Sequence, residues 1–392
     1  MNNKTYRKIL CMPILLLAIL FLNEVAWCAG QEKVVFINER KQPDGSYSIY
    51  GYYDIYIVNS DGTGLKRLID NGINPVPSPD GKKIAFISII HSESDIGISV
   101  IKSDGTGRKD LIQKEKEKSI GFCCLRWSPD GKKIAYATSE MGVSDKVGVL
   151  SLWVIDVTTG EKKQLYSPLP GIPCLSWSTD SRELLVFTIG FLHGRPDEAT
   201  IINVKTNKKM KSAIDKLNVK PTNMLILDDK RLLFYKDEAL WIMNRDTSNN
   251  KKLVHVGKIF EMSSSKPALE ILPNKNVRMI IDESGDKGTT IGLYEYNHVT
   301  ELLKRKAKTD DSGFYGFFSY DGSKILGESE TRPTYDENEL KKGTILPKPF
   351  FYKLYVKDLK SEKEYVLSDS WRVFKQDIVM VYENVNWVAP SE

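Results

Sequence analysis

The stretch SPDGKKIAF at residues 78–86 returns as SPDGKKIAY at residues 128–136, and WSTDSRELLVF at residues 177–187 is a third copy. The three copies are spaced 50 residues apart, and Trp127 and Trp177 precede the second and third copies at the same position. Weaker copies follow at residues 227–234, 272–281 and 319–326. A fixed spacing of this size indicates that one structural unit repeats along the chain.

A second element lies between these copies. It reads DIYIVNSDGTG at residues 54–64 and GISVIKSDGTG at residues 97–107. Degenerate versions continue the series, which makes seven in all, at residues 152–160, 200–207, 240–246, 291–297 and 352–358. The element therefore accompanies the first one through the whole chain.

The residues of the repeat are typical of β-strands. Val, Ile, Tyr, Phe and Trp concentrate in short runs, and Asp-Gly dipeptides separate the runs as they do in tight turns. We count about four strands in each unit of roughly 45 to 50 residues, repeated about seven times, which is the pattern of a β-propeller. The sequence predicts an all-β fold of four-stranded blades, with seven blades expected and six or eight as alternatives.

The repeated Asp-Gly turns are expected to be structural, because glycine adopts positive φ at little cost and so closes a tight turn. The residues expected in these turns are Asp80, Gly81, Asp130, Gly131, Asp61, Gly62, Asp104 and Gly105.

Together the two elements resemble the TolB-like repeat, a relative of the WD repeat that occurs in bacterial periplasmic proteins. The resemblance is strong over residues 34–190 and weaker over residues 200–392. It implies a periplasmic propeller that binds a protein or a component of the cell envelope. TolB itself carries an α/β domain before its propeller. Here the strand-like residues 34–37 come directly after the N-terminal segment at residues 1–29, which has the pattern of a leader. The resemblance therefore covers the propeller and not the α/β domain of TolB, and it does not by itself imply a role in the Tol system.

Residues 1–29 have the pattern of a secretory signal peptide. Lys4, Arg7 and Lys8 precede the apolar run at residues 9–22, and small residues follow near residues 26–30. The run is shorter than the roughly 20 residues that a membrane-spanning helix needs, so a retained anchor is the weaker alternative. Residues 25–28 faintly resemble a lipoprotein box, but Trp27 stands where a small residue is required, so lipidation of Cys28 is not expected. We predict a periplasmic or secreted propeller over residues 30–392.

Three cysteines remain beyond the leader, namely Cys123, Cys124 and Cys174. In an oxidising compartment either one disulfide and one free thiol or three buried thiols are possible, and buried thiols are favoured. Cys124 and Cys174 are one repeat apart, so they should occupy equivalent places in neighbouring blades. Such places are usually too far apart for a disulfide.

Closure of the ring requires a strand from the C-terminus. The strand-like residues 34–38 match the second strand of a unit whose first strand is missing. The simplest candidate for the missing strand is residues 371–374, which leaves the apolar residues 378–382 unassigned.

Recognition is expected on one face of the propeller. Connections between second and third strands are long and differ from one another, at residues 40–53, 89–95, 139–150, 189–199 and 329–350. Long irregular loops on a rigid scaffold often carry function. The candidate partner-binding residues are His193 and Arg195 in one of these loops, and Arg332 and Tyr335 in another.

No catalytic motif is visible. The sequence has no Gly-x-Ser-x-Gly elbow, no phosphate-binding glycine motif and no His or Cys spacing typical of zinc, so we expect neither a cofactor nor a metal. The net charge of +5 without long basic runs gives no sign of nucleic-acid binding. We expect a monomeric, non-enzymatic scaffold. The alternative is a carbohydrate-active enzyme, such as a polysaccharide lyase, that uses His91, His193 or Arg195 at the axis.

Overall fold

The computed structural model describes sixteen segments of the chain. Their bounds are residues 32–39, 53–89, 96–113, 120–140, 149–169, 171–189, 198–211, 223–246, 248–259, 269–272, 276–284, 290–310, 314–319, 321–331, 349–373 and 386–388. The regular structure within them is β-strand throughout. In this part of the chain no helix is long and apolar enough to cross a membrane.

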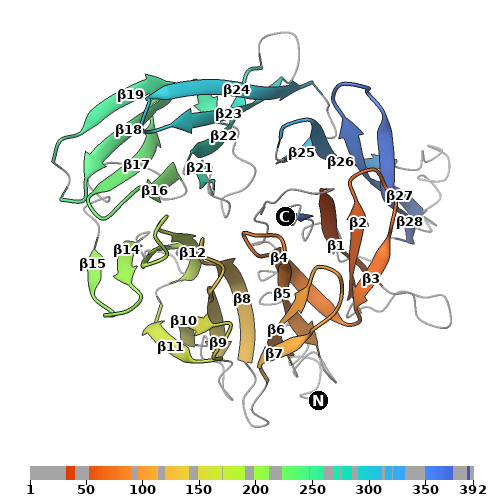
Figure 1. Cartoon of the computed structure of the whole chain (residues 1–392), viewed down its shortest axis with the longest axis horizontal. Coiled ribbons are helices and arrows are strands. Elements are labelled where there is room, and N and C mark those ends of the chain that lie inside the picture. Colours follow the sequence, from red (N-terminus) through yellow and green to blue (C-terminus); the bar gives the residue numbers. More distant parts are fainter. Residues whose placement is uncertain are drawn as a thin grey trace, which may run out of the picture.

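The strands form seven antiparallel sheets that follow one another around a ring (Figure 1). We number these sheets blade 1 to blade 7. The first three are blade 1 with β29 (Asn386–Val388), β1 (Lys33–Glu39), β2 (Tyr53–Asn59) and β3 (Lys66–Ile69), blade 2 with β4 (Gly72–Pro77), β5 (Lys83–Ile89), β6 (Ile96–Lys102) and β7 (Lys109–Ile112), and blade 3 with β8 (Ile120–Trp127), β9 (Lys133–Glu140), β10 (Val149–Asp156) and β11 (Lys162–Tyr166).

The other four blades repeat this arrangement. They are blade 4 with β12 (Ile172–Trp177), β13 (Glu183–Ile189), β14 (Glu198–Asn203) and β15 (Lys209–Lys211), blade 5 with β16 (Met224–Ile226), β17 (Arg231–Lys236), β18 (Ala239–Asn244) and β19 (Lys251–His255), blade 6 with β20 (Lys258–Ile259) and β21 (Leu269–Ile271) both paired to β22 (Val277–Asp282), then β23 (Ile291–Asn297) and β24 (Leu302–Thr309), and blade 7 with β25 (Phe314–Phe318), β26 (Lys324–Thr331), β27 (Pro349–Asp358) and β28 (Glu364–Val373). The predictions of an all-β propeller and of seven blades are confirmed. Six of the sheets have four strands, and blade 6 has a fifth because β20 and β21 both pair with β22.

The C-terminus closes the ring, but with a different segment from the one predicted. The strand β29 pairs with β1 in the register Lys33↔Val388, Val34↔Trp387 and Val35↔Asn386. The prediction of residues 371–374 was wrong, because Trp371 lies in β28 and pairs with Phe351 of β27. Residues 378–382 lie outside the described residues.

The core is divided among the contacts between neighbouring blades. Seven buried apolar clusters are present in the described residues, and each combines side chains of two adjacent blades. Trp127 is 5% exposed between blades 2 and 3, and Trp177 is 7% exposed between blades 3 and 4. Both tryptophans are therefore core residues at blade junctions. Burial at every junction fixes each blade against its neighbours and makes the ring a rigid platform.

Candidate functional site

The four residues selected from the sequence, His193, Arg195, Arg332 and Tyr335, lie outside the described residues. His91, named for the enzymatic alternative, also lies outside them. A role in binding or catalysis for these side chains stays a prediction.

The ends of the described strands do locate the connections that carry these residues. Second and third strands are joined by long segments at residues 40–52, 90–95, 141–148, 190–197 and 332–348. Blade 6 adds one that the sequence analysis missed, at residues 283–290. Blade 5 is the exception, because Asp237 and Glu238 alone make the turn, with φ of 50° and 57°. All of these connections leave the same face of the ring, which we call the loop face.

The opposite face, here the turn face, is built from tight turns whose polar groups bond to one another. Ser78 Oγ donates to Asp80 Oδ1 at 2.6 Å, and the amides of Lys82 and Lys83 donate to Asp80 Oδ1 and Ser78 Oγ at 3.1 and 2.9 Å. Gly81 completes the turn with φ of 63°. The same serine–aspartate bond recurs in other blades, from Ser128 to Asp130, from Ser178 to Asp180 and from Ser319 to Asp321.

The turns between third and fourth strands on this face are closed in a similar way. The Thr106 amide and hydroxyl each donate to Asp104 Oδ1 at 2.7 Å, and these hydrogen bonds hold the pKa of Asp104 below its ordinary value. Thr63 makes the same two bonds to Asp61, and glycines with positive φ follow the two aspartates. The turn aspartates thus serve their own turns, and in the described residues no group of three or more His, Cys, Asp or Glu could hold a metal ion.

Lysines tie neighbouring turns together along the outer edge of this face. Lys66 Nζ donates to the carbonyl of Asp104 at 2.6 Å, from blade 1 to blade 2. Lys109 donates to the carbonyls of Val157 and Thr158, from blade 2 to blade 3, and Lys163 donates to those of Val204 and Lys205, from blade 3 to blade 4. Each lysine starts or nearly starts the outermost strand of its blade, so the repeat itself generates this series of contacts.

A pocket of about 330 Å³ opens on the turn face between blades 4, 5 and 6. Its lining comes from the first turn of blade 4, the first turn of blade 5 and the outer turn of blade 6. The lining residues are Thr179, Asp180, Arg182, Leu227, Asp228, Asp229 and His298. The sequence analysis did not select this place.

The pocket lies where the repeat departs from its own pattern. Thr179 replaces the proline found in the two preceding copies, and its hydroxyl donates to the Leu227 carbonyl of blade 5 at 3.1 Å. Ser181 replaces the glycine and keeps a φ of 61°, while its Oγ accepts a hydrogen bond from the Asp130 amide of blade 3 at 3.0 Å. Both replacements turn a local turn residue into a contact between blades.

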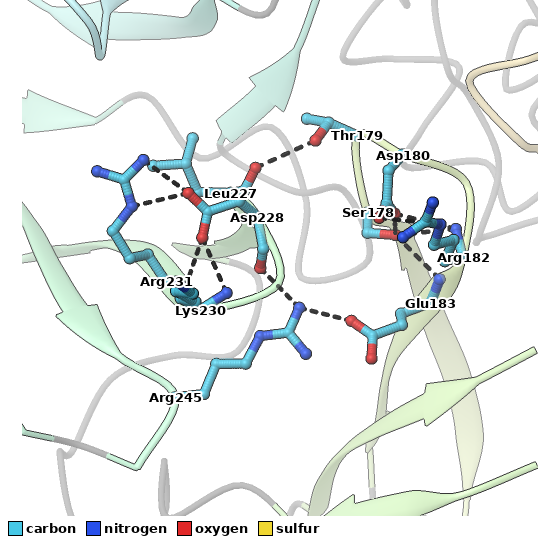
Figure 2. Close-up of polar contacts among 10 residues, drawn as sticks. All are labelled: Ser178, Thr179, Asp180, Arg182, Glu183, Leu227, Asp228, Lys230, Arg231 and Arg245. Carbon is cyan, nitrogen blue, oxygen red and sulfur yellow. Dashed lines mark hydrogen bonds and ion pairs between the residues drawn. The ribbon is translucent and has the colours of Figure 1, made fainter.

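Arg245 lies between Asp228, which lines the pocket, and Glu183 (Figure 2). One guanidinium nitrogen contacts Glu183 Oε2 at 2.5 Å and donates to the Asp228 carbonyl at 2.7 Å. The side chains of Arg245 and Glu183 are only 13% and 19% exposed. The arginine belongs to blade 5 and the glutamate to blade 4, so this ion pair joins the two blades under the turns that line the pocket.

The Asp228 carboxylate is fully engaged by its own turn. It accepts hydrogen bonds from the amides of Lys230 and Arg231 and from the Arg231 side chain. Burial opposes ionisation, but the hydrogen bonds from Arg231 and Lys230 outweigh it, and the pKa of Asp228 is below its ordinary value. The pocket therefore presents an ionised, pre-positioned carboxylate at Asp228. Such a lining suits recognition of a polar group, and a general acid would instead require a raised carboxyl pKa.

We expect the Arg245–Glu183 pair to be a measurable part of the junction between blades 4 and 5. Arg245→Met removes two charge-assisted bonds and leaves the mostly buried Glu183 without this partner, so the free energy of unfolding in urea should fall by about 2 kcal/mol. Arg182→Met, whose side chain is 77% exposed, is the matched control and should change it by less than about 0.5 kcal/mol. Equal effects of the two substitutions would contradict a stabilising role for the ion pair.

The comparisons with known proteins agree with this fold. A stretch of 151 residues, 37% of this chain, is 26% identical to dipeptidyl-peptidase 5 of Porphyromonas gingivalis and covers 21% of that protein. The chain thus matches about a fifth of the length of that curated relative. No protein-family profile matches the chain.

Among solved structures, the acylaminoacyl peptidase of Pyrococcus horikoshii superposes with a TM-score of 0.50 at 14% identity, over 86% of this chain and 57% of that one. TolB of Acinetobacter baumannii superposes with a TM-score of 0.41 at 13% identity, over 91% of this chain and 83% of that one. In fold, the chain is a seven-bladed β-propeller. At these identities the similarity shows the fold alone.

Proposed function

We propose that this chain is an exported, non-enzymatic scaffold that binds a protein or another component of the cell envelope through its loop face. The observation that carries the proposal is the contrast between blade 5 and the other blades. Asp237 and Glu238 are enough to join the second and third strands of a blade, yet the other six blades use longer segments at the same place. Length beyond what the fold requires is typical of binding loops.

The turn face supports the same assignment. Its serines and aspartates bond within their own turns, and lysines tie several of those turns to the next blade. Together with the buried clusters between blades, these contacts supply a rigid base on which loops of different sequence can vary. A rigid base lowers the ordering cost of binding, because only the loops need to adapt.

The residues proposed to contact the partner are His193 and Arg195, between β13 and β14, and Arg332 and Tyr335, between β26 and β27. Arginine and tyrosine are enriched at energetically important positions of protein interfaces. Export follows from the proposed signal peptide at residues 1–29, which places the partner in the periplasm or outside the cell.

The test is crosslinking in cells that express the full, signal-bearing chain, followed by identification of what co-purifies. In the test variant, Asn-Gly replaces residues 190–196, which keeps the register in which Thr188 pairs with Glu198. We expect this variant to lose a specific partner that the unaltered chain captures. The single substitutions Arg195→Ala and Tyr335→Ala should weaken the capture.

The matched control places Asn-Gly at Asp237 and Glu238 in blade 5, on the same face but in a connection that is already a two-residue turn. It should capture the partner as the unaltered chain does. Thermal unfolding of both variants checks that the propeller is intact. The proposal fails if the unaltered chain captures no specific component, or if capture survives the 190–196 replacement and both single substitutions.

A further inference from the structure

Two adjacent cysteines meet on the innermost strand of blade 3. The Cys124 thiol donates a hydrogen bond to Cys123 Sγ, and the two sulfur atoms are 3.2 Å apart. In a regular strand successive side chains point to opposite faces of the sheet, so neighbouring thiols are kept apart. The contact therefore requires a local departure from strand geometry.

A β-bulge provides that departure. Cys123 pairs with Ala137 and Arg126 pairs with Ala135, so β8 carries one extra residue opposite β9 at this point. Cys124 sits in the bulge with φ of 61°, in the left-handed region that few residues other than glycine, asparagine and aspartate adopt. The bulge turns both thiols to the same side of the strand.

Blade 2 has the same bulge without cysteines. Its innermost strand shifts register between Ile73 and Val76, and Asn74, one repeat before Cys124, has φ of 55°. In blade 4 the corresponding pairs Cys174↔Phe187 and Leu175↔Val186 follow without a shift. The bulge at Cys124 is thus shared with blade 2, where no cysteine is present, so this backbone geometry does not depend on the cysteine pair.

The two thiols differ in access. Cys124 is 3% exposed and packs into the cluster between blades 3 and 4, whereas Cys123 is partly exposed at the edge of that cluster. The hydrogen bond to Cys123 and burial raise the pKa of the Cys124 thiol, and the positive charge of Arg126 opposes this rise. Cys123 is the thiol that a reagent in solution reaches first.

We propose that Cys123 and Cys124 form a redox-active dithiol whose oxidised form is a disulfide between the two adjacent residues. The oxidant is an external disulfide, and oxidised glutathione is the disulfide used as the probe. The Cys123 thiolate attacks one of its sulfurs and releases one thiolate. Cys124 Sγ, once deprotonated, then attacks Cys123 Sγ and releases the second thiolate. Two protein thiols are oxidised, one external disulfide is reduced to two thiols, and the two protons pass to those products.

Such a bond is expected to be reversible. Adjacent Cα atoms are about 3.8 Å apart across a trans peptide, below the roughly 4.4 to 6.8 Å usual for disulfides, and departures from that range make a disulfide easier to reduce. Easily reduced disulfides are typical of responsive sites, while structural ones resist the glutathione pool. The pair is therefore suited to report redox conditions at the inner wall of blade 3.

Peptide mapping of the full, folded chain tests this directly. The protein is incubated with oxidised glutathione, quenched in acid, denatured, alkylated and digested with trypsin, which releases residues 119–126 with both cysteines in one peptide. We expect this peptide to lack both alkyl groups and to be lighter than the dithiol form by two hydrogen atoms. A subsequent excess of reduced glutathione should return it to the doubly alkylated form.

Cys174 is the internal control, because trypsin places it in a different peptide, residues 164–182. Cys174→Ala should leave the oxidation unchanged, and Cys123→Ser should abolish it. Cys124→Asn should also abolish it while keeping the fold, since Asn74 occupies the same left-handed position in blade 2. The proposal is overturned if both thiols stay fully alkylatable in oxidised glutathione, if a stable glutathione adduct accumulates, or if the two peptides become linked through Cys174.

Discussion

Replacing Trp127 with alanine should lower the free energy of unfolding by about 3 to 5 kcal/mol, the range usual for truncating a large buried aromatic side chain. The indole is 5% exposed and packs against side chains of blades 2 and 3. Its Nε1 donates to the carbonyl of Val76 in blade 2 at 2.8 Å. The substitution therefore opens a cavity at a blade junction and removes a hydrogen bond across it.

Urea unfolding followed by circular dichroism measures this effect without depending on the fluorescence of the replaced tryptophan. Trp127→Phe separates the two contributions, because it keeps most of the apolar contact but leaves the Val76 carbonyl without this donor, so about 1 to 2 kcal/mol should be lost. Trp177→Ala should resemble Trp127→Ala, since Trp177 donates to the Arg126 carbonyl at the next junction. A loss below about 1 kcal/mol for Trp127→Ala would show that the junction does not depend on the indole.

The fold could be predicted so fully because its sequence signals are local. The Asp-Gly turn of the first two copies, the Trp-Ser pair of the second and third, and the apolar run after each turn are all local in sequence, and the first three copies are spaced 50 residues apart. The structure uses them locally too, since Asp130 closes the turn that Ser128 begins and Trp127 ends the strand before it. A signal that acts within one repeat can be recognised from the sequence of that repeat, and its recurrence along the chain makes the fold prediction more secure.

The strand that closes the ring could not be predicted from such local signals. The closing strand β29 has three residues, carries no mark of the repeat and pairs with β1 from the other end of the chain. Residues 371–374 were the simplest candidate, but β27 and β28 are each ten residues long and extend far enough to include Trp371. A pairing between strands so distant in sequence leaves no local pattern to detect.

The candidate pocket was missed for a related reason. Its signal was present, because the third copy is the first along the chain in which both the proline and the glycine are replaced, here by Thr179 and Ser181. The residues that complete the pocket, Leu227, Asp228 and His298, belong to blades 5 and 6. Only the ring brings them together, so a departure from the repeat could be seen in the sequence while its consequence could not.

Deleting residues 386–392 should be the most damaging small truncation of this chain. The deletion removes β29 and leaves the inner backbone edge of β1 unpaired beside Val34 and Val35, both fully buried. Each buried backbone group that loses its partner costs about 1 to 3 kcal/mol, so the free energy of unfolding should fall by roughly 5 kcal/mol. Urea unfolding measures the fall, and limited proteolysis should then cleave near β1 first, because that strand has lost one of its two neighbours.

Deleting only residues 389–392 is the matched control, because it shortens the same terminus but keeps every residue paired with β1, and it should leave stability within about 0.5 kcal/mol of the full chain. A synthetic peptide of residues 383–392 added to the longer truncation should restore part of the lost stability, since the missing strand can pair from solution. If both truncations unfold at the same urea concentration, the ring is held by its blade junctions alone. In that case the seven buried clusters between blades would close the ring, and the three-residue strand β29 would form as a consequence of that closure.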